Sequence, residues 1–357
     1  IVAGTIHFVL GFQHYPAETS KMRETIRRNI EKRLNSVLDV VELLAEHDVP
    51  QSKMLADAYF RTGNEKRFDR LQKRFSKLLI DIPVLNDKAE EDARKPGVFP
   101  AIKFSDMERD AGVCTPGNAD MAARIYREHG AVLLENSLHR NVINECREYI
   151  FSHYDDYFKD NRPKDSLRVG NKRFMITLAV DGPINQPSVY APPTVMPILE
   201  RLLSDKMILG SLVAVTSLPG AKDQSRHRDH HALFPGEDLQ PPPFATSVMI
   251  PLIDMNEEVG ATRIFKGSHL RPTDEAKKMP PQDPVVSVGS CFLMDYRVQH
   301  MGMANKSKDK VRPVVTLIFQ RPWFRDYVNY DNQERLVMPD AELQKIPEEH
   351  RKLFDWK

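Results

Sequence analysis

The sequence predicts a mainly β protein with flanking helices, an α+β chain whose strands form a sandwich or barrel. Two observations carry this prediction. From Arg168 onward, short runs of β-branched and apolar residues are separated by turn residues, a density typical of sandwiches and barrels. Before Arg168, apolar residues recur at helical spacing, so helices are expected on the outside of the β structure. The strand-like runs are Phe174–Val180, Ile208–Ser217, Thr246–Ile253, Thr262–Phe265, Val285–Met294 and Pro313–Gln320.

The first third of the chain is predicted to be helical. Met22, Ile26 and Ile30 begin a helical pattern that ends at Pro50, and a second helix is expected after Gly63. These helices are candidates for a homodimer interface or for a cap over an active site, and the sequence does not choose between the two.

A proline- and glycine-containing polar stretch, residues 87–117, marks the candidate domain boundary. We therefore expect a helical extension over residues 1–110, a β domain over residues 118–330 and a C-terminal tail over residues 331–357.

Between this boundary and the strand-rich region, the pattern predicts a helix, a strand and a helix. Ala119–His129 has helical spacing, and Gly130 ends it. Ala131–Glu135 is an apolar run typical of a buried strand, and a longer helix follows from about Leu138 to Phe158. A further helix is expected over Met196–Lys206.

Composition excludes several classes of partner. Lys plus Arg number 51 and Asp plus Glu 50, and a net charge of +1 does not support a general attraction to nucleic acid. No segment reaches the run of about 20 apolar residues that spans a bilayer, so no membrane span is expected. The 3 cysteines are too few and scattered for a disulfide framework, which favours a reducing, cytoplasmic location.

The segment that carries chemistry is His227-Arg228-Asp229, shortly after a predicted strand. Residues two apart in an extended chain point the same way, so His227 and Asp229 would present an imidazole and a carboxylate on one face. His300 is the candidate for a third ligand. Two histidines and one carboxylate leave three open positions on an octahedral iron, the facial triad of non-haem iron oxygenases.

A single His-x-Asp pair is weak evidence, because a chain with 12 histidines is expected to contain about one by chance. A second copy, His153-Tyr154-Asp155, does occur. It lies in a helical pattern, where residues two apart do not share a face, and we reject it on that ground.

Arg312 strengthens the case for the first copy. It follows His300 by twelve residues across a polar loop, and would return close to His300 if the flanking runs paired as antiparallel neighbours. A guanidinium offers a planar, permanently charged fork for a carboxylate. A keto acid such as 2-oxoglutarate needs both features, a metal for its keto-carboxylate end and a cation for its distal carboxylate.

With these residues the sequence resembles the phytanoyl-CoA dioxygenase family of iron(II)- and 2-oxoglutarate-dependent oxygenases, from about Ala119 to Phe324. The resemblance rests on several motifs in a fixed order. They are the glycine-led strand at Gly130–Leu134, Gln224 before the His-x-Asp pair, the run Leu252, Asp254 and Gly260 leading to Gly267-Ser268-His269, and the distal block His300, Gly302, Asn305 and Arg312.

This resemblance implies a double-stranded β-helix, also called a jelly roll, and the N-terminal helical extension predicted over residues 1–110 lies outside it. It implies that His227, Asp229 and His300 hold iron(II) and that Arg312 binds the distal carboxylate of 2-oxoglutarate. The implied reaction uses O2 to hydroxylate, or otherwise oxidise, a C–H bond and releases succinate and CO2.

Residues matching Gln224 and Thr262 contact the cosubstrate in natural-product members of this family, and the resemblance carries that role to them. The substrate expected here is a small molecule, a specialised metabolite, with an acyl-CoA ester as the second choice. Candidate pocket residues are His231, which shares the parity of Asp229, Phe234 on a proline-rich segment after the ligands, and Phe174, which is equally a core residue.

Two other classes of function stay open at this point. One is a metal-dependent hydrolase of the same fold, which would hold zinc in the same site and would not need Arg312. The other is a non-catalytic jelly-roll binding protein, with the N-terminal helices as its interaction module.

Overall fold

The computed structural model describes most of the chain beyond residue 85. The described residues are 86, 88–159, 166–231, 233–234, 239, 241–330 and 334–355. The chain divides into two units, and the larger one, residues 85–114 and 118–357, carries the β structure. The helices predicted before residue 85 lie outside the described residues.

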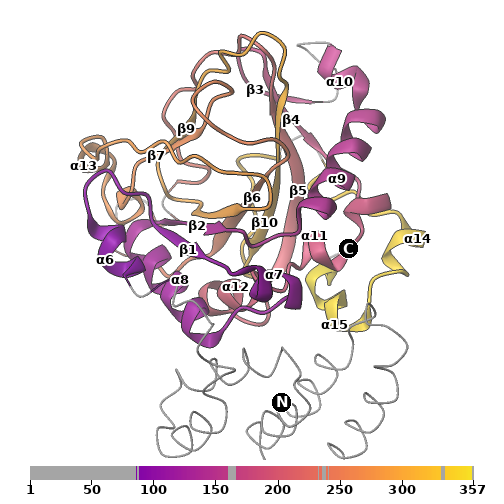
Figure 1. The fold of residues 1–357 in the computed structure, drawn as a ribbon, viewed down its shortest axis with the longest axis horizontal. Helices are drawn as coiled ribbons and strands as arrows, with labels where there is room; N and C mark the ends of the chain where they lie inside the picture. Colours follow the sequence, from indigo (N-terminus) through magenta and orange to yellow (C-terminus); the bar gives the residue numbers. More distant parts are fainter. Residues whose placement is uncertain are drawn as a thin grey trace, which may run out of the picture. The chain divides into compact units, whose positions relative to one another are not determined.

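Eight strands form one large sheet, in the order β1-β2-β8-β6-β10-β5-β4-β3 (Figure 1). β1 and β2 pair in parallel, and all other neighbours pair antiparallel. The strands are β1 (Ala101–Lys103), β2 (Ala131–Glu135), β3 (Leu167–Gly170), β4 (Arg173–Thr177), β5 (Ile208–Ser217), β6 (Ala245–Pro251), β8 (Cys291–Asp295) and β10 (Arg312–Gln320).

A second, small sheet consists of β7 (Thr262–Ile264) and β9 (His300–Gly302). The large and the small sheet both contribute walls to one cavity, so they face each other across it. This pairing of an open large sheet with a small one is a double-stranded β-helix. The mainly β fold with flanking helices is thereby confirmed.

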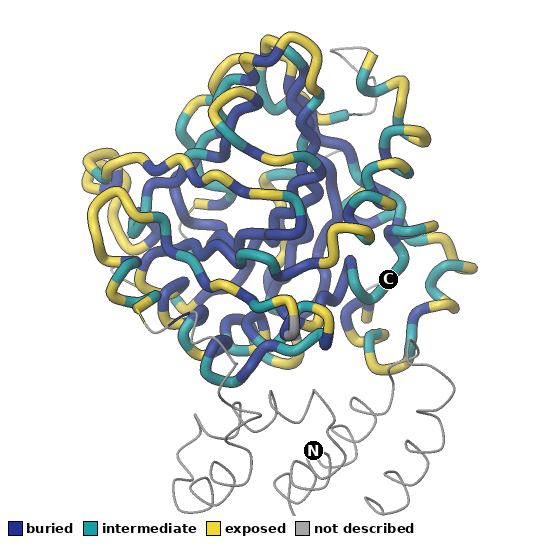
Figure 2. Tube along the Cα trace, viewed as in Figure 1, coloured by how far each residue is buried: buried dark blue, intermediate teal, exposed yellow. Residues whose placement is uncertain are grey.

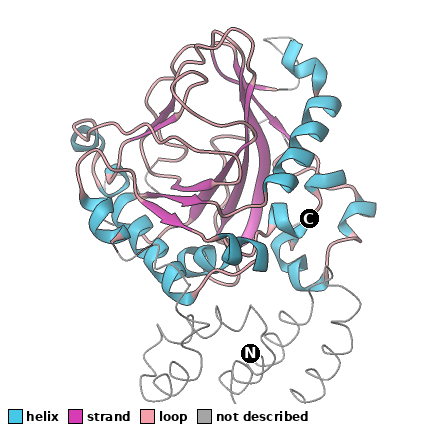
Figure 3. Ribbon diagram, in the orientation of Figure 1, coloured by secondary structure: helices cyan, strands magenta, loops and turns pink. Residues whose placement is uncertain are grey.

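Helices cover the outer face of the large sheet, as Figure 3 shows. The longer ones are α8 (Pro116–His129), α9 (Arg140–His153) and α12 (Met196–Leu203). Shorter helices, of which α13 lies on the side of the small sheet (Figure 1), are α6 (Ala89–Arg94), α7 (Asp106–Ala111), α10 (Asp155–Lys159), α11 (Pro187–Tyr190), α13 (Thr273–Ala276), α14 (Asp340–Leu343) and α15 (Glu348–Arg351), with 3-10 turns at Gly182–Ile184, Ser268–Leu270 and Lys352–Phe354. Within the described part of the chain, no helix is both long and apolar enough to cross a membrane.

Strand alternation divides each central strand between two environments. In β10, Val315, Leu317 and Phe319 pack into the main core with the helices, whereas Val314 and Thr316 line the cavity. Both sets are buried, because one face is covered by helices and the other by the small sheet (Figure 2). This explains why the strand is an uninterrupted apolar run rather than an alternating one.

The structure differs from the sequence predictions at three places. β1 lies inside the predicted boundary region 87–117 yet pairs with β2, so the prolines and glycines there mark turns within the β unit. The long helix predicted from Leu138 is two helices, α9 and α10, with Tyr154 between them. β9 pairs with β7 and not with β10, whose partners are β5 and β6.

The loop between β9 and β10 is fastened by one buried amide, Asn305. Its Nδ2 donates to the backbone oxygens of Ser217 at 3.2 Å and Lys310 at 2.7 Å, and its Oδ1 accepts from the backbone nitrogen of Ser307 at 3.1 Å. Because these bonds hold the chain that leads into Arg312, Asn305 fixes where β10 begins.

We expect Asn305→Ala to lower the free energy of unfolding by about 3 kcal/mol, since it leaves buried backbone groups without partners. The midpoint of urea unfolding measures this loss. Lys308→Ala, an exposed change in the same loop, is the control and should stay within about 0.5 kcal/mol of the parent protein. Equal midpoints for the two variants would contradict the role given to Asn305.

Candidate active site

The three residues of the predicted metal triad converge in the structure. One donor atom from each of His227, Asp229 and His300 lies within 4.8 Å of the other two. A pair of backbone hydrogen bonds joins His227 to His300, with nitrogen-to-oxygen distances of 3.0 and 2.9 Å. The segment that carries His227 and Asp229 is therefore tied directly to β9, which carries His300.

Both imidazole rings are oriented by backbone oxygens. Nδ1 of His227 lies 2.8 Å from the carbonyl oxygen of Ser225, and Nδ1 of His300 lies 3.1 Å from that of Val298. Because a carbonyl oxygen only accepts, each Nδ1 carries a hydrogen, and in the neutral ring this tautomer leaves the lone pair on Nε2. Carbonyl partners of this kind orient histidine ligands in metal sites.

The environment favours the neutral form of His300. Burial lowers the pKa of this imidazole, and this effect exceeds the opposing attraction of Asp229. His300 Nε2 lies 3.4 Å from Asp229 Oδ1, so the imidazole lone pair and the carboxylate face the same point. A neutral imidazole beside a carboxylate is the protonation state that metal binding requires.

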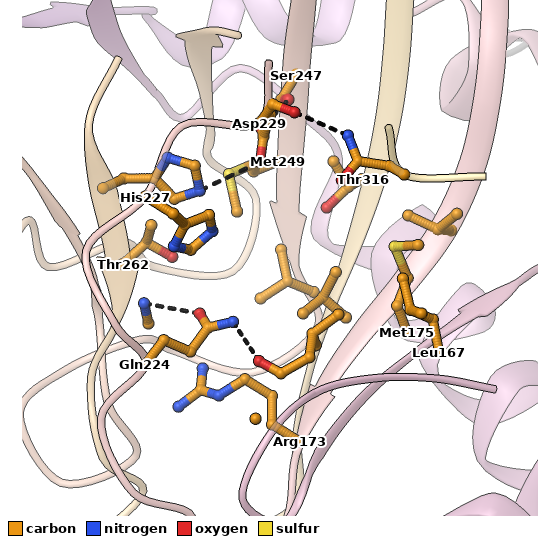
Figure 4. A pocket seen from close by; sticks show the side chains of 18 of the residues that line it. Leu167, Arg173, Met175, Gln224, His227, Asp229, Ser247, Met249, Thr262 and Thr316 are labelled. Carbon is orange, nitrogen blue, oxygen red and sulfur yellow. Dashed lines mark hydrogen bonds and ion pairs between the residues drawn. The ribbon is translucent and has the colours of Figure 1, made fainter. Parts of the chain in front are cut away.

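Asp229 is supported from two other elements. Ser247 Oγ on β6 lies 3.5 Å from its Oδ2, and Asn329 Nδ2 donates to its backbone oxygen at 2.9 Å. Figure 4 shows His227 and Asp229 directed into the same space, with Thr262 beside them.

The triad opens into a cavity of about 560 Å³ between the two sheets. Two arginines, Arg173 and Arg312, lie in its wall and are nearly inaccessible to solvent. Both are paired in register with Ser217 of the intervening strand β5, so they project from the same level of the sheet.

Neither guanidinium is fully satisfied by the protein. In Arg312, Nε and Nη2 are buried with no hydrogen-bond partner, and Nε of Arg173 is in the same state. Burial, and then the neighbouring charge of Arg173, lower the pKa of Arg312 to about 9. Burial likewise lowers the pKa of Arg173 to about 10, although Asp223 opposes this effect.

Burying two cations whose hydrogen-bond donors are unused costs free energy unless an anion pairs with them. One cavity is lined by both Arg312 and the triad, so a single ligand could contact the arginine at one end and a metal at the other. A dicarboxylate that chelates a metal with one end and pairs with an arginine at the other fits this donor set.

Gln224 and Thr262, for which a contact with the cosubstrate is predicted, also line the cavity. The amide of Gln224 is already occupied, because its Oε1 accepts from the backbone nitrogen of Gly302 at 2.8 Å and its Nε2 donates to the backbone oxygen of Val169 at 2.6 Å. Gln224 thus links the small sheet to β3 and shapes the wall beside Arg173 (Figure 4).

Three predicted pocket residues, Phe174, His231 and Phe234, are not among the described residues that line the cavity. Phe174 belongs to the helix-facing core, because its neighbours Arg173 and Met175 take the cavity side of β4. His231 is exposed, since the chain leaves the extended conformation after Asp229, and the side chain of Phe234 is 45% exposed.

The sequence analysis did not identify Arg173, Asn329 or Tyr330, which the structure places in the cavity wall. For Arg173 a signal existed, namely one arginine at the start of an otherwise apolar strand. For Asn329 and Tyr330 the segment shows no periodic pattern, and only the folded chain brings it to the cavity.

A jelly roll whose two sheets enclose such a triad belongs to the class of non-haem iron oxygenases. The sequence profile of the phytanoyl-CoA dioxygenase (PhyH) family matches residues 126–314, more than half of the 357 residues. The chain therefore belongs to the phytanoyl-CoA dioxygenase family. It is an iron(II)- and 2-oxoglutarate-dependent dioxygenase that also consumes O2.

Curated relatives agree with this assignment. The chain is 25% identical over 237 residues to dioxygenase aneA of Aspergillus aculeatus, which covers 60% of this chain and 76% of the relative. It is 26% identical over 199 residues to dioxygenase trt7 of Aspergillus terreus, covering 53% and 68%. Among solved structures, AviO1 from Streptomyces viridochromogenes superposes with a TM-score of 0.43 at 19% identity, over 58% of this chain and 96% of that one.

Gly302 offers a direct test of the arginine end of the cavity. A methyl group at this position would lie 2.1 Å from Arg173 Nη1 and 2.5 Å from Gln224 Oε1, so both side chains must move. We expect Gly302→Ala to weaken 2-oxoglutarate binding on the order of tenfold or more, because displacements of about 1 Å are costly in such sites. Anaerobic titration of the iron-loaded protein with 2-oxoglutarate measures the change. An unaltered dissociation constant would contradict the packing described here.

Proposed function

We propose that His227, Asp229 and His300 hold the iron, that Arg312 binds the distal carboxylate of 2-oxoglutarate, and that the enzyme oxidises a C–H bond of a small specialised metabolite. The observation that supports this most is the convergence of three metal donors beside a buried arginine with unused hydrogen-bond donors. Succinate and CO2 are the expected coproducts.

The residues divide the work between binding and orientation. The two histidines and the carboxylate of Asp229 would hold the metal at the cavity wall, where the cosubstrate could reach it. Arg312 fixes the far end of the cosubstrate, and Arg173 adds a second positive charge at the same end. When bound, iron would activate O2, whose four oxidising equivalents are shared between the conversion of 2-oxoglutarate to succinate and CO2 and the oxidation of the C–H bond.

The sheets contribute by excluding water. Arg312 and His300 are almost fully buried, so the charge of Arg312 acts in a medium of low polarity, where it interacts more strongly than in water. Asp229 is a carboxylate and occupies the third ligand position, which leaves no gap for a halide there and favours oxidation of the substrate over its halogenation.

The state of the three cysteines bears on the cellular compartment of the protein. Cys114, Cys146 and Cys291 are buried and form no disulfide. Burial raises the pKa of each, so they are poor nucleophiles. Three buried thiols without a bridge support the cytoplasmic location expected from the sequence.

We expect Asp229→Ala to weaken iron(II) binding at least about 100-fold, because even residues that only support ligands contribute 10- to 100-fold. Metal affinity is measured by anaerobic titration. Asp274→Ala, which removes an exposed carboxylate on α13, is the matched control and should bind iron like the parent protein. Equal affinity in both variants would favour the non-catalytic jelly-roll alternative.

We expect Arg312→Leu to bind iron normally and to bind 2-oxoglutarate at least about 30-fold more weakly, equivalent to about 2 kcal/mol for a buried charge pair. Conversion of 2-oxoglutarate to succinate should fall in parallel. The exposed Arg325→Leu serves as control. A parent protein that forms no succinate with iron and ascorbate, yet hydrolyses substrates with zinc, would support the metal-dependent hydrolase instead.

A further inference from the structure

The cavity has a charged end and an apolar side. Arg173 and Arg312 stand at one level of the large sheet, where both pair with the same residue of β5. At the next level on the same face stand Met175, Val215 and Val314, which are in register across β4, β5 and β10. Along these three strands, the charged side chains of the cavity face are therefore those of the arginine level.

The apolar side is completed by a residue beyond the last strand. Tyr330, in the segment that follows β10, packs against Met175 of β4 and Val213 of β5. Its hydroxyl is committed, because it lies 2.7 Å from the hydroxyl of Ser211, and both groups are buried. Because the hydroxyl is already bonded, Tyr330 presents the face of its aromatic ring to the cavity. Leu167 and Met175 belong to the same wall, which Figure 4 shows opposite His227.

This segment is held at the metal site by Asp326. The buried carboxylate of Asp326 accepts from the backbone nitrogens of Val328 and Asn329 at 3.0 and 3.1 Å, and from the hydroxyl of Tyr296 at 3.2 Å. Asn329 in turn donates to the backbone oxygen of the metal-site residue Asp229. Tyr330 is thus placed next to the triad by a short chain of hydrogen bonds.

We infer that Tyr330, with Met175 and Val213, forms the surface that selects the substrate, and that this substrate is an uncharged, largely apolar molecule. The inference rests on the function proposed above. Among the described lining residues, the permanently positive ones are Arg173 and Arg312, and the cosubstrate uses that end. A polyanionic carrier such as coenzyme A finds no further cation in this wall, whereas a neutral ring or chain gains by covering apolar surface.

The test uses N-phenyl-1-naphthylamine, a neutral aromatic fluorophore, with the full-length protein loaded with iron(II) and 2-oxoglutarate in the absence of O2. We expect Tyr330→Ala to weaken probe binding at least about fivefold. Tyr330→Phe, which keeps the ring, should stay within about twofold of the parent. Tyr327→Ala is the matched control, because Tyr327 lies on the same segment and is 67% exposed. Equal binding by Tyr330→Ala and the parent would overturn the inference.

Competition decides the charge of the ligand. Methyl octanoate and octanoyl-CoA carry the same chain, and we expect the neutral ester to displace the probe at the lower concentration. Stronger displacement by octanoyl-CoA would overturn the inference of an uncharged substrate.

Binding of 2-oxoglutarate to the iron-loaded protein, followed by absorbance, separates this inference from the proposed function. Retained binding in Tyr330→Ala with loss of the probe supports a role in substrate selection. A parent protein that binds no 2-oxoglutarate refutes the proposed function, and with it the assignment of this wall to a substrate.

Discussion

The site depends on one short backbone interaction, the pair of hydrogen bonds between His227 and His300. These bonds join a segment without regular structure to strand β9 of the small sheet. They bring the two imidazoles together, with ring centroids 4.3 Å apart and the ring planes inclined at 53°, and place Asp229 within reach of both. The two histidines are 73 residues apart in sequence, and the hydrogen bonds between Gln224 and Gly302 are a second connection between the same two segments.

The large sheet contributes a second constraint, which is register. Because β4 and β10 both pair with β5, a single residue of β5 determines that Arg173 and Arg312 lie level with each other. Slipping either strand by one residue would turn its arginine into the helix-facing core. The helices bury the face of the large sheet that is turned away from the cavity (Figure 3). They therefore hold the sheet rigid without lining the cavity themselves.

Sequence patterns predicted the parts of this arrangement that are encoded locally. The strand Ile208–Ser217 was predicted with its observed bounds, because it is apolar on both faces and has a turn after it. The triad followed from a His-x-Asp pair in an extended context together with a family resemblance. Arg312 was predicted to lie near His300 for a partly incorrect reason, since β10 and β9 belong to different sheets and meet only across the cavity.

What the sequence could not predict depends on pairing between distant segments. Phe174 was a candidate for either the pocket or the core, and the register of β4 places it in the core and its neighbour Arg173 in the cavity wall. Tyr330 lies in a stretch with no periodic signal, and its hydroxyl is held at the cavity by Ser211 of β5, which precedes it by 119 residues. In each case the determining contact joins residues that are far apart in the chain, and no local pattern records it.

The most direct test of this account is a crystal structure of the protein with iron(II), or manganese(II) in its place, and 2-oxoglutarate under anaerobic conditions. The account predicts one anomalous-scattering peak within bonding distance of Nε2 of His227, Nε2 of His300 and a carboxylate oxygen of Asp229, with the distal carboxylate of the cosubstrate on Arg312. A metal bound elsewhere, or a cosubstrate whose distal end lies away from Arg312, would contradict it.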